Sequence, residues 1–282
     1  MIRTTPKPLM LRKVPTRIPQ RLPKGKGMSV GLATICTDGL VICADTLISM
    51  DTFKYYRPKL SRVQYAITSK SVVLAYSGSL DKNNVIVSQF ENELGRIRDK
   101  SAQEIGDSFQ AVLNGVFPGK AKENHQMLCG FADAKTLFLL KSRDREVSPV
   151  QVWDCIGYGD SSLIQYLATI FLEDRIHLPI RLAVPICDYI IAQAKKYVQW
   201  CGGDTNLFVL TPDSKFHEQI PSSEIDALCG RIERGINSML TSASMLDLDE
   251  RECLEVVKGL RGLIEEASSK FMSFCPPLPV TV

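Results

Sequence analysis

Apolar residues dominate two short segments, 28–36 and 40–45, and the polar triplet Thr37-Asp38-Gly39 separates them. Two apolar runs joined by a turn that contains Asp-Gly predict a β-hairpin. The second run ends in Ala44-Asp45, so a carboxylate follows directly on a strand of apolar residues. This hairpin is the most informative local pattern in the chain.

The same kind of pattern predicts further elements as far as residue 211. Helices are expected from the spacing of apolar residues over 84–97 and from Ser101, a suitable N-cap, to Gly119. Two more are expected after Asp160, which would cap the first, and over about 182–200. Strands are predicted at 59–67, 71–76, 127–132, 136–141, 150–156 and 206–211. Sheets and helices segregated in this way predict an α+β class.

The pattern changes after Pro221. Amphipathic segments at 223–244 and about 247–271 predict two more helices, and the chain closes on a proline-rich tail at 276–279. We therefore expect three parts, a leader at 1–27, a main domain at 28–220 and a helical extension at 221–282. The extension is expected to serve in packing or in contacts between subunits, rather than as a binding module.

Charge separates the leader from the rest. Residues 1–27 hold eight Lys and Arg, no acidic residue and five prolines, whereas the remaining 26 basic and 31 acidic residues give 28–282 a net charge of −5. The prolines exclude a continuous helix, so we expect a disordered leader or sequence upstream of the true start residue. A nucleic-acid-binding arm is the alternative on charge alone, but no aromatic residue interleaves the charges, and no nucleic-acid partner is predicted.

Composition narrows the classes of protein to which the chain could belong. No apolar run reaches the roughly 18–20 residues of a membrane helix, and the N-terminus lacks the apolar core of a secretory signal. Nine cysteines without a Cys-x-x-Cys spacing predict reduced, buried thiols in a cytoplasmic protein. The three histidines are isolated and no phosphate-binding glycine loop occurs, so neither a metal site nor a cofactor is expected.

Ser29 carries the candidate chemistry. It follows Met28, and removal of that methionine would give Ser29 both a hydroxyl and a free α-amine. A residue of this kind can act as nucleophile with its own amine as base, which is the chemistry of N-terminal nucleophile hydrolases. The alternative is an ordinary serine near the start of a strand.

Five short motifs resemble, in the same order, those of proteasome β-type subunits. Together they cover about residues 28–210, and they are Asp38-Gly39-x-Val-x-x-Ala44-Asp45-Thr46, Lys59-Leu-Ser-Arg-Val63, Tyr76-Ser-Gly-Ser-Leu-Asp81, Ile156-Gly-Tyr-Gly-Asp160 and Cys201-Gly-Gly-Asp204. The resemblance implies a four-layer αββα sandwich and a closed homo-oligomeric ring or half-ring.

The resemblance also assigns catalytic roles. Ser29 would be the nucleophile, and Asp45 would hold a lysine and orient the amine. Lys59 would supply a positive charge that lowers the pKa of the hydroxyl and of the amine. Arg57 and Arg62 compete with Lys59 for this role, because the gap between Asp45 and Lys59 is shorter than is usual in the family.

Further positions would complete the site. Gly78 is the candidate donor of a backbone N–H to an oxyanion hole, since glycine allows close approach of the backbone, and Ser77 is the competing position. Asp160 and Ser161 are the candidate supporting residues. The candidate nucleophile is a serine where the family has a threonine, and serine lacks the β-branch that restricts the threonine side-chain rotamer. The chain also departs from the family at three other positions. The three are Tyr158 for a serine, Val198 for a second aspartate and Cys201 for a serine.

These features predict a hydrolase of the N-terminal nucleophile type, a peptidase that acts on peptide or protein substrates within a homo-oligomeric ring. Such an assembly would accommodate an unfolding partner. Two alternatives stay open, a non-catalytic structural or interaction subunit with the same fold, and a hydrolase of small amides. No membrane partner is expected.

Overall fold

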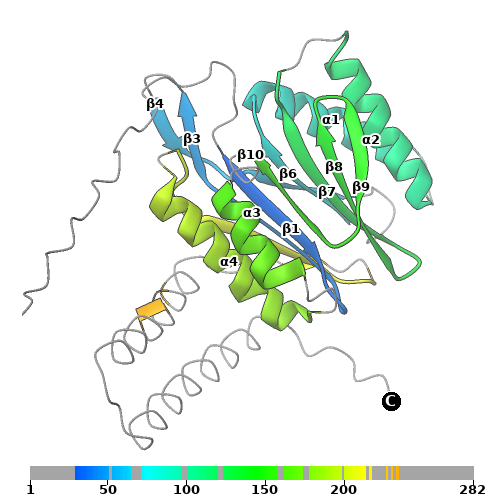
Figure 1. Cartoon of the computed structure of the whole chain (residues 1–282). Coiled ribbons are helices and arrows are strands. Elements are labelled where there is room, and N and C mark those ends of the chain that lie inside the picture. The colour runs from blue at the N-terminus through cyan, green and yellow to red at the C-terminus, as the bar shows by residue number, and fades with distance from the viewer. Residues whose placement is uncertain are drawn as a thin grey trace, which may run out of the picture.

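The computed structural model of the chain describes residues 29–50, 53–64, 71–96, 101–119, 123–157, 162–173, 178–198, 200–213 and 216–217, and the single positions 227, 230, 233 and 234 (Figure 1). The strands described form two five-stranded sheets and one two-stranded sheet. The predicted leader at 1–27 and nearly all of the predicted extension at 221–282 lie outside the described residues.

The first sheet contains the predicted hairpin. Its strands lie in the order β10 (Trp153–Gly157), β1 (Val30–Ile35), β2 (Leu40–Asp45), β11 (Thr205–Leu210) and β12 (Phe216–His217). The Cys36 N–H donates to the Gly39 carbonyl at 2.7 Å and closes the turn. The Asp38 carboxylate accepts the Ile180 N–H at 2.7 Å, which fixes this turn to the start of a helix.

The second sheet has the order β5 (Leu60–Gln64), β6 (Ser71–Ser77), β7 (Gln126–Asp133), β8 (Thr136–Arg143) and β9 (Glu146–Val150). The predicted strand over 150–156 corresponds to β10 but starts too early, because Val150 ends β9 in this sheet, whereas Trp153 begins β10 in the other. Only residues 151 and 152 separate the two strands, and the chain crosses there between the sheets. A small hairpin of β3 (Leu47–Met50) and β4 (Phe53–Tyr56), not predicted, leaves the end of β2.

In the described part of the chain, four α-helices lie against the sheets. They are α1 (Leu80–Gly95), α2 (Ala102–Val116), α3 (Ser162–Ala168) and α4 (Ile180–Tyr197), and α3 continues as a π-helical turn over Thr169–Glu173. The predicted cap at Ser101 is confirmed, since Ser101 and Glu104 form a reciprocal capping box. Helix α1 begins earlier than predicted because Ser79 caps it, and α2 ends at Val116 rather than Gly119. The predicted Asp160 cap and the helices over 223–244 and 247–271 lie outside the described part of the chain.

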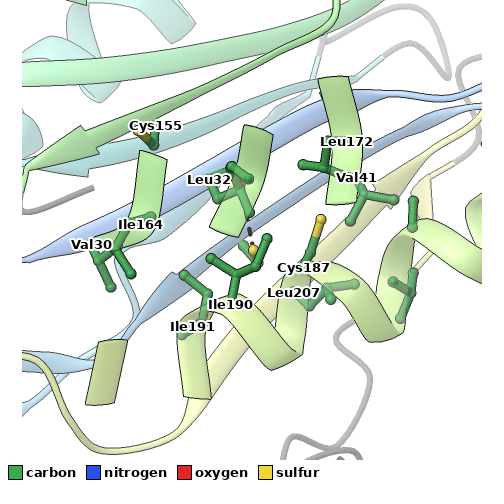
Figure 2. Close-up of a cluster of buried hydrophobic side chains, with 14 of the residues drawn as sticks. Val30, Leu32, Val41, Cys155, Ile164, Leu172, Cys187, Ile190, Ile191 and Leu207 are labelled. Carbon is green, nitrogen blue, oxygen red and sulfur yellow. Dashed lines mark hydrogen bonds between the residues drawn. The ribbon is translucent and has the colours of Figure 1, made fainter. Parts of the chain in front are cut away.

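Three apolar clusters hold these elements together. One joins the first sheet to α3 and α4, a second joins the second sheet to α1 and α2, and a third combines residues of both sheets. Successive residues of β1 and β2 alternate between the first and third clusters, as the two faces of a strand must; Leu32 and Cys43 belong to one, Ala33 and Ile42 to the other. Figure 2 shows Leu32, Val41, Cys187 and Ile190 meeting in the first cluster. Burial on both faces explains why these strands are mostly apolar.

No helix of the described residues is long and apolar enough to cross a membrane.

Candidate active site

Ser29 lies immediately before β1, with 7% of its surface exposed. The next residue, Val30, pairs with Gly157 at the end of β10. The Val30 N–H donates to the Asp45 carboxylate at 3.0 Å. The main chain beside Ser29 is therefore fastened directly to the carboxylate that ends β2.

The same carboxylate holds a lysine. Lys59 Nζ lies 2.7 Å from Asp45 Oδ1, and both side chains are completely buried. Lys59 also donates to the Leu47 carbonyl oxygen. A buried ion pair of this kind is stable only when further hydrogen bonds satisfy the remaining donors and acceptors, and here Asp45 receives two backbone N–H groups as well.

The structure distinguishes Lys59 from the two arginines that competed with it in the sequence. Arg62 donates to the Ser71 hydroxyl at 3.0 Å and lies over the Phe216 ring at 4.4 Å. Arg57 is exposed to solvent, and its described hydrogen bond is made by its backbone N–H. Lys59 is the basic residue that meets Asp45.

A turn distant in sequence completes the environment of Asp45. The Gly202 N–H donates to Asp45 Oδ2 at 3.1 Å, while the Gly202 carbonyl accepts the N–H groups of Thr46 and Leu47. The Asp204 N–H donates to Thr46 Oγ1 at 2.8 Å. The Cys201-Gly-Gly-Asp204 motif thus holds the end of β2 in place, a role that the sequence did not predict for it.

Burial dominates the electrostatics of the pair. It lowers the pKa of Lys59, and the neighbouring Asp45 carboxylate opposes this shift. It also raises the pKa of Asp45, which Lys59 and the N–H groups of Val30 and Gly202 oppose. These shifts bring the proton affinities of the two groups closer together than in water. Burial and the adjacent carboxylate raise the pKa of the Cys201 thiol, so Cys201 stays protonated and is a poor nucleophile.

Gly78 lies in the tight turn between β6 and α1, with a φ of +132° that side-chain-bearing residues rarely adopt. A Cβ at this position would lie 2.6 Å from His125 Nδ1. His125 is almost fully buried between the rings of Tyr76 and Phe117. The imidazole therefore packs directly against the candidate oxyanion turn, and nothing in the sequence around this single histidine indicated that contact.

Gly157 is the point where the two sheets meet beside Ser29. Its φ is +69°, and a Cβ there would clash with the Ser29 carbonyl and lie 2.5 Å from Ser77 Oγ. Its N–H donates to the Gln126 side-chain oxygen at 2.6 Å. Glycine at 157 is what allows the second sheet, through Ser77 and Gln126, to approach the main chain of Ser29.

The structure therefore joins the Asp45 carboxylate to Lys59 and to the backbone N–H of Val30, the residue after Ser29, and it places Ser77 next to the same end of β1. Gly78 follows Ser77 directly. The predicted supporting residues Asp160 and Ser161, and the departure at Tyr158, lie outside the described residues.

Comparison with known proteins identifies the fold. Neither a scan of protein-family models nor a search of curated proteins finds a match. Among solved structures, the chain is similar to an Anbu Gly-1 mutant from Hyphomicrobium sp. strain MC1, with 12% identity, 77% of this chain and 99% of that chain covered, and a TM-score of 0.66. Anbu, described as an ancestral beta-subunit, from Yersinia bercovieri has 16% identity over 78% and 100% of the chains, with a TM-score of 0.63. The Anbu complex from Pseudomonas aeruginosa has 14% identity over 78% and 97%, with a TM-score of 0.59.

These similarities correct the family predicted from the sequence. The similar structures are Anbu proteins, which are proteasome-like but distinct from proteasome β-type subunits, so the predicted membership in the β-type family is wrong. At such low identity the likeness shows the fold alone. The class is α+β with the proteasome-like fold that the Anbu proteins share. The five motifs marked the shared fold rather than the particular family.

Proposed function

We propose that the chain is an N-terminal nucleophile hydrolase with an Anbu-like fold, in which Ser29 becomes the first residue and attacks amide bonds of peptides. The observation that carries this proposal is the shared carboxylate of Asp45, which binds both the main chain beside Ser29 and the buried ammonium of Lys59. A hydroxyl needs an adjacent base and positive charge to react near neutral pH, and this arrangement brings the charge to the start of β1.

The reaction follows from these groups. The Ser29 α-amine accepts the proton of the Ser29 hydroxyl as the oxygen attacks the substrate carbonyl, and the amine then protonates the departing nitrogen. Water hydrolyses the resulting ester and regenerates the hydroxyl. Asp45 and Lys59 fix the electrostatic environment, and the Gly78 turn would donate a backbone N–H to the developing oxyanion. Asp160 and Ser161 would support the site.

We further propose that the sheets and helices form a four-layer αββα unit over 28–220, that residues 1–28 are removed, and that 221–282 contributes contacts between copies of the chain. The fold likeness to Anbu, for which a helical assembly is described from Pseudomonas aeruginosa, supports a homo-oligomer. Light scattering at micromolar concentration should give a mass several times that of one processed chain, which is somewhat below the 31.4 kDa of all 282 residues. A stable monomer would contradict the assembly.

The activity is tested with the full-length protein as it is produced. Intact mass and N-terminal sequencing should place the first residue at Ser29, and a panel of fluorogenic peptides should be hydrolysed. Ser29→Ala should abolish turnover because it removes the attacking oxygen. Ser142→Ala, which removes another buried hydroxyl on β8, should not.

Each of the other outcomes would assign a different function to the chain. Full turnover by the Ser29→Ala variant would exclude Ser29 as nucleophile. An assembled wild-type protein that retains residues 1–28 and cleaves no peptide or small amide would be a non-catalytic subunit. Cleavage of small amides alone would indicate a small-amide hydrolase on the same fold.

A further inference from the structure

The Ser77 hydroxyl is buried and unsatisfied among the described residues. Ser77 ends β6 with 1% of its surface exposed, and its Oγ has no hydrogen-bond partner among the described residues. An unsatisfied buried hydroxyl costs about 1–3 kcal/mol, so such groups in native proteins call for an explanation. The five residues directly before Ser77, residues 72–76, all belong to apolar clusters, so the hydroxyl stands at the end of an apolar stretch of β6.

Its position points to Ser29. Ser77 Oγ lies 2.5 Å from the place where a Cβ on Gly157 would stand, and the Ser29 carbonyl lies against the same place. The other polar side chain at this junction, Gln126, already accepts the Gly157 N–H through its oxygen. Ser77 is therefore a free hydroxyl beside the backbone of the proposed nucleophile.

We infer that Ser77 is a positioning residue for the α-amine of Ser29, the group that is released when the bond between residues 28 and 29 is cut. The hydroxyl can accept a hydrogen bond from this amine and can donate one to its lone pair. In the uncut chain the Ser29 nitrogen is a peptide nitrogen without a basic lone pair, and Ser77 Oγ has no partner among the described residues; the amine that it would orient is created by the cleavage. This inference rests on the proposed function, because it gives Ser77 a partner only in the processed protein.

The amine needs such a partner. Serine lacks the β-branch that restricts the side-chain rotamer of threonine, and a terminal amine is free to rotate about its own bond. A hydrogen bond from Ser77 would hold the amine toward the Ser29 hydroxyl, in the orientation needed for proton transfer.

The test uses the protein that is produced from the full-length sequence and has been cut before Ser29, together with a peptide epoxyketone. In this reagent the Ser29 oxygen adds to the ketone carbon and the amine nitrogen opens the epoxide. Two bonds to the protein form, no group leaves, and the mass rises by that of the whole reagent. The adduct therefore reports on the hydroxyl and the amine together. Its rate is followed by intact mass against pH for the wild type, Ser77→Ala, Ser77→Thr and the matched control Ser142→Ala.

We expect Ser77→Ala to lower the rate of adduct formation and kcat by about tenfold, the value of one hydrogen bond, and Ser142→Ala to leave both unchanged. Ser77→Thr should restore the rate. In the uncut chain, which keeps residues 1–28, thermal unfolding of Ser77→Ala should be unchanged or shifted upward, because there the variant removes an unsatisfied hydroxyl. A purely structural role predicts the opposite, a loss of stability.

A failure of this inference and a failure of the proposed function give different results. Unaltered rates in Ser77→Ala, with the wild type modified at Ser29, would overturn this inference alone. A wild type that is never modified at Ser29 would overturn the proposed function and this inference with it.

Discussion

Acid should destabilise the fold through His125. This side chain has 1% of its surface exposed, and its ring centroid lies 6.5 Å from that of Tyr76 and 5.4 Å from that of Phe117. Within the described part of the chain, neither ring nitrogen has a hydrogen-bond partner. Burial lowers the pKa of His125 from 6.5 to about 4, and the nearby charges of Asp144, Lys82 and Glu123 have smaller, partly opposing effects.

The magnitude follows from linkage. As the pH falls, the unfolded chain takes up a proton on His125 near pH 6.5, whereas the folded chain does so only near pH 4. The unfolded state binds more protons between these values, so the contribution to stability is fully present above pH 6.5 and is lost as the pH falls toward 4. At 1.36 kcal/mol for each pKa unit, the total loss is about 3 kcal/mol.

Urea unfolding of the wild type and of His125→Phe between pH 7.5 and 4 measures this term. Phenylalanine keeps the stacked ring and cannot titrate, while the carboxylates are the same in both proteins. The difference in unfolding free energy should therefore grow in favour of the variant by about 2–3 kcal/mol across this range. A wild type and variant whose stabilities fall in parallel with pH would refute the argument, as would an NMR titration of His125 with a midpoint near 6.5.

Three further perturbations test the packing of the site. Lys59→Met should lower the free energy of unfolding by about 3–5 kcal/mol because it leaves Asp45 charged and buried, and adding Asp45→Asn should recover part of the loss in a double-mutant cycle; additive losses would show that the two side chains do not interact. Gly157→Ala should lower the free energy of unfolding by at least about 2 kcal/mol, because the alanine Cβ would clash with the Ser29 carbonyl and φ is positive at this position. Gly115→Ala on helix α2 should raise it by about 0.5–1 kcal/mol, because nothing lies within 4 Å of the new Cβ. Equal effects of the two substitutions in calorimetry would contradict this reasoning. The six described cysteines are buried, so peptide mapping after a thiol reagent at pH 8 should find them unmodified in the folded protein and modified in urea, and rapid labelling without denaturant would show that the core opens.

Much of the fold could be predicted from local pattern. The hairpin of β1 and β2 follows from two apolar runs around Asp-Gly, and the start of α2 follows from the capping box at Ser101. Both signals depend on residues a few positions apart. The boundary error at 150 arose because the local sequence does not show that the chain passes there from one sheet to the other. The β3–β4 hairpin lacks a distinctive turn signal and was missed.

The sequence by itself determined which residue types stand at the start and end of the hairpin, Ser29 and Asp45, because this depends on order along the chain alone. Only the tertiary structure decided what these residues meet. Gly202, 157 residues further along the chain, donates a hydrogen bond to Asp45. Lys59, rather than either arginine, is the buried basic residue beside Asp45. Ser77 lies close to the Ser29 main chain because Gly157, which stands next to both, has no side chain. Such contacts depend on how two sheets and their helices pack in three dimensions, and packing is set by the whole core rather than by any local run of residues.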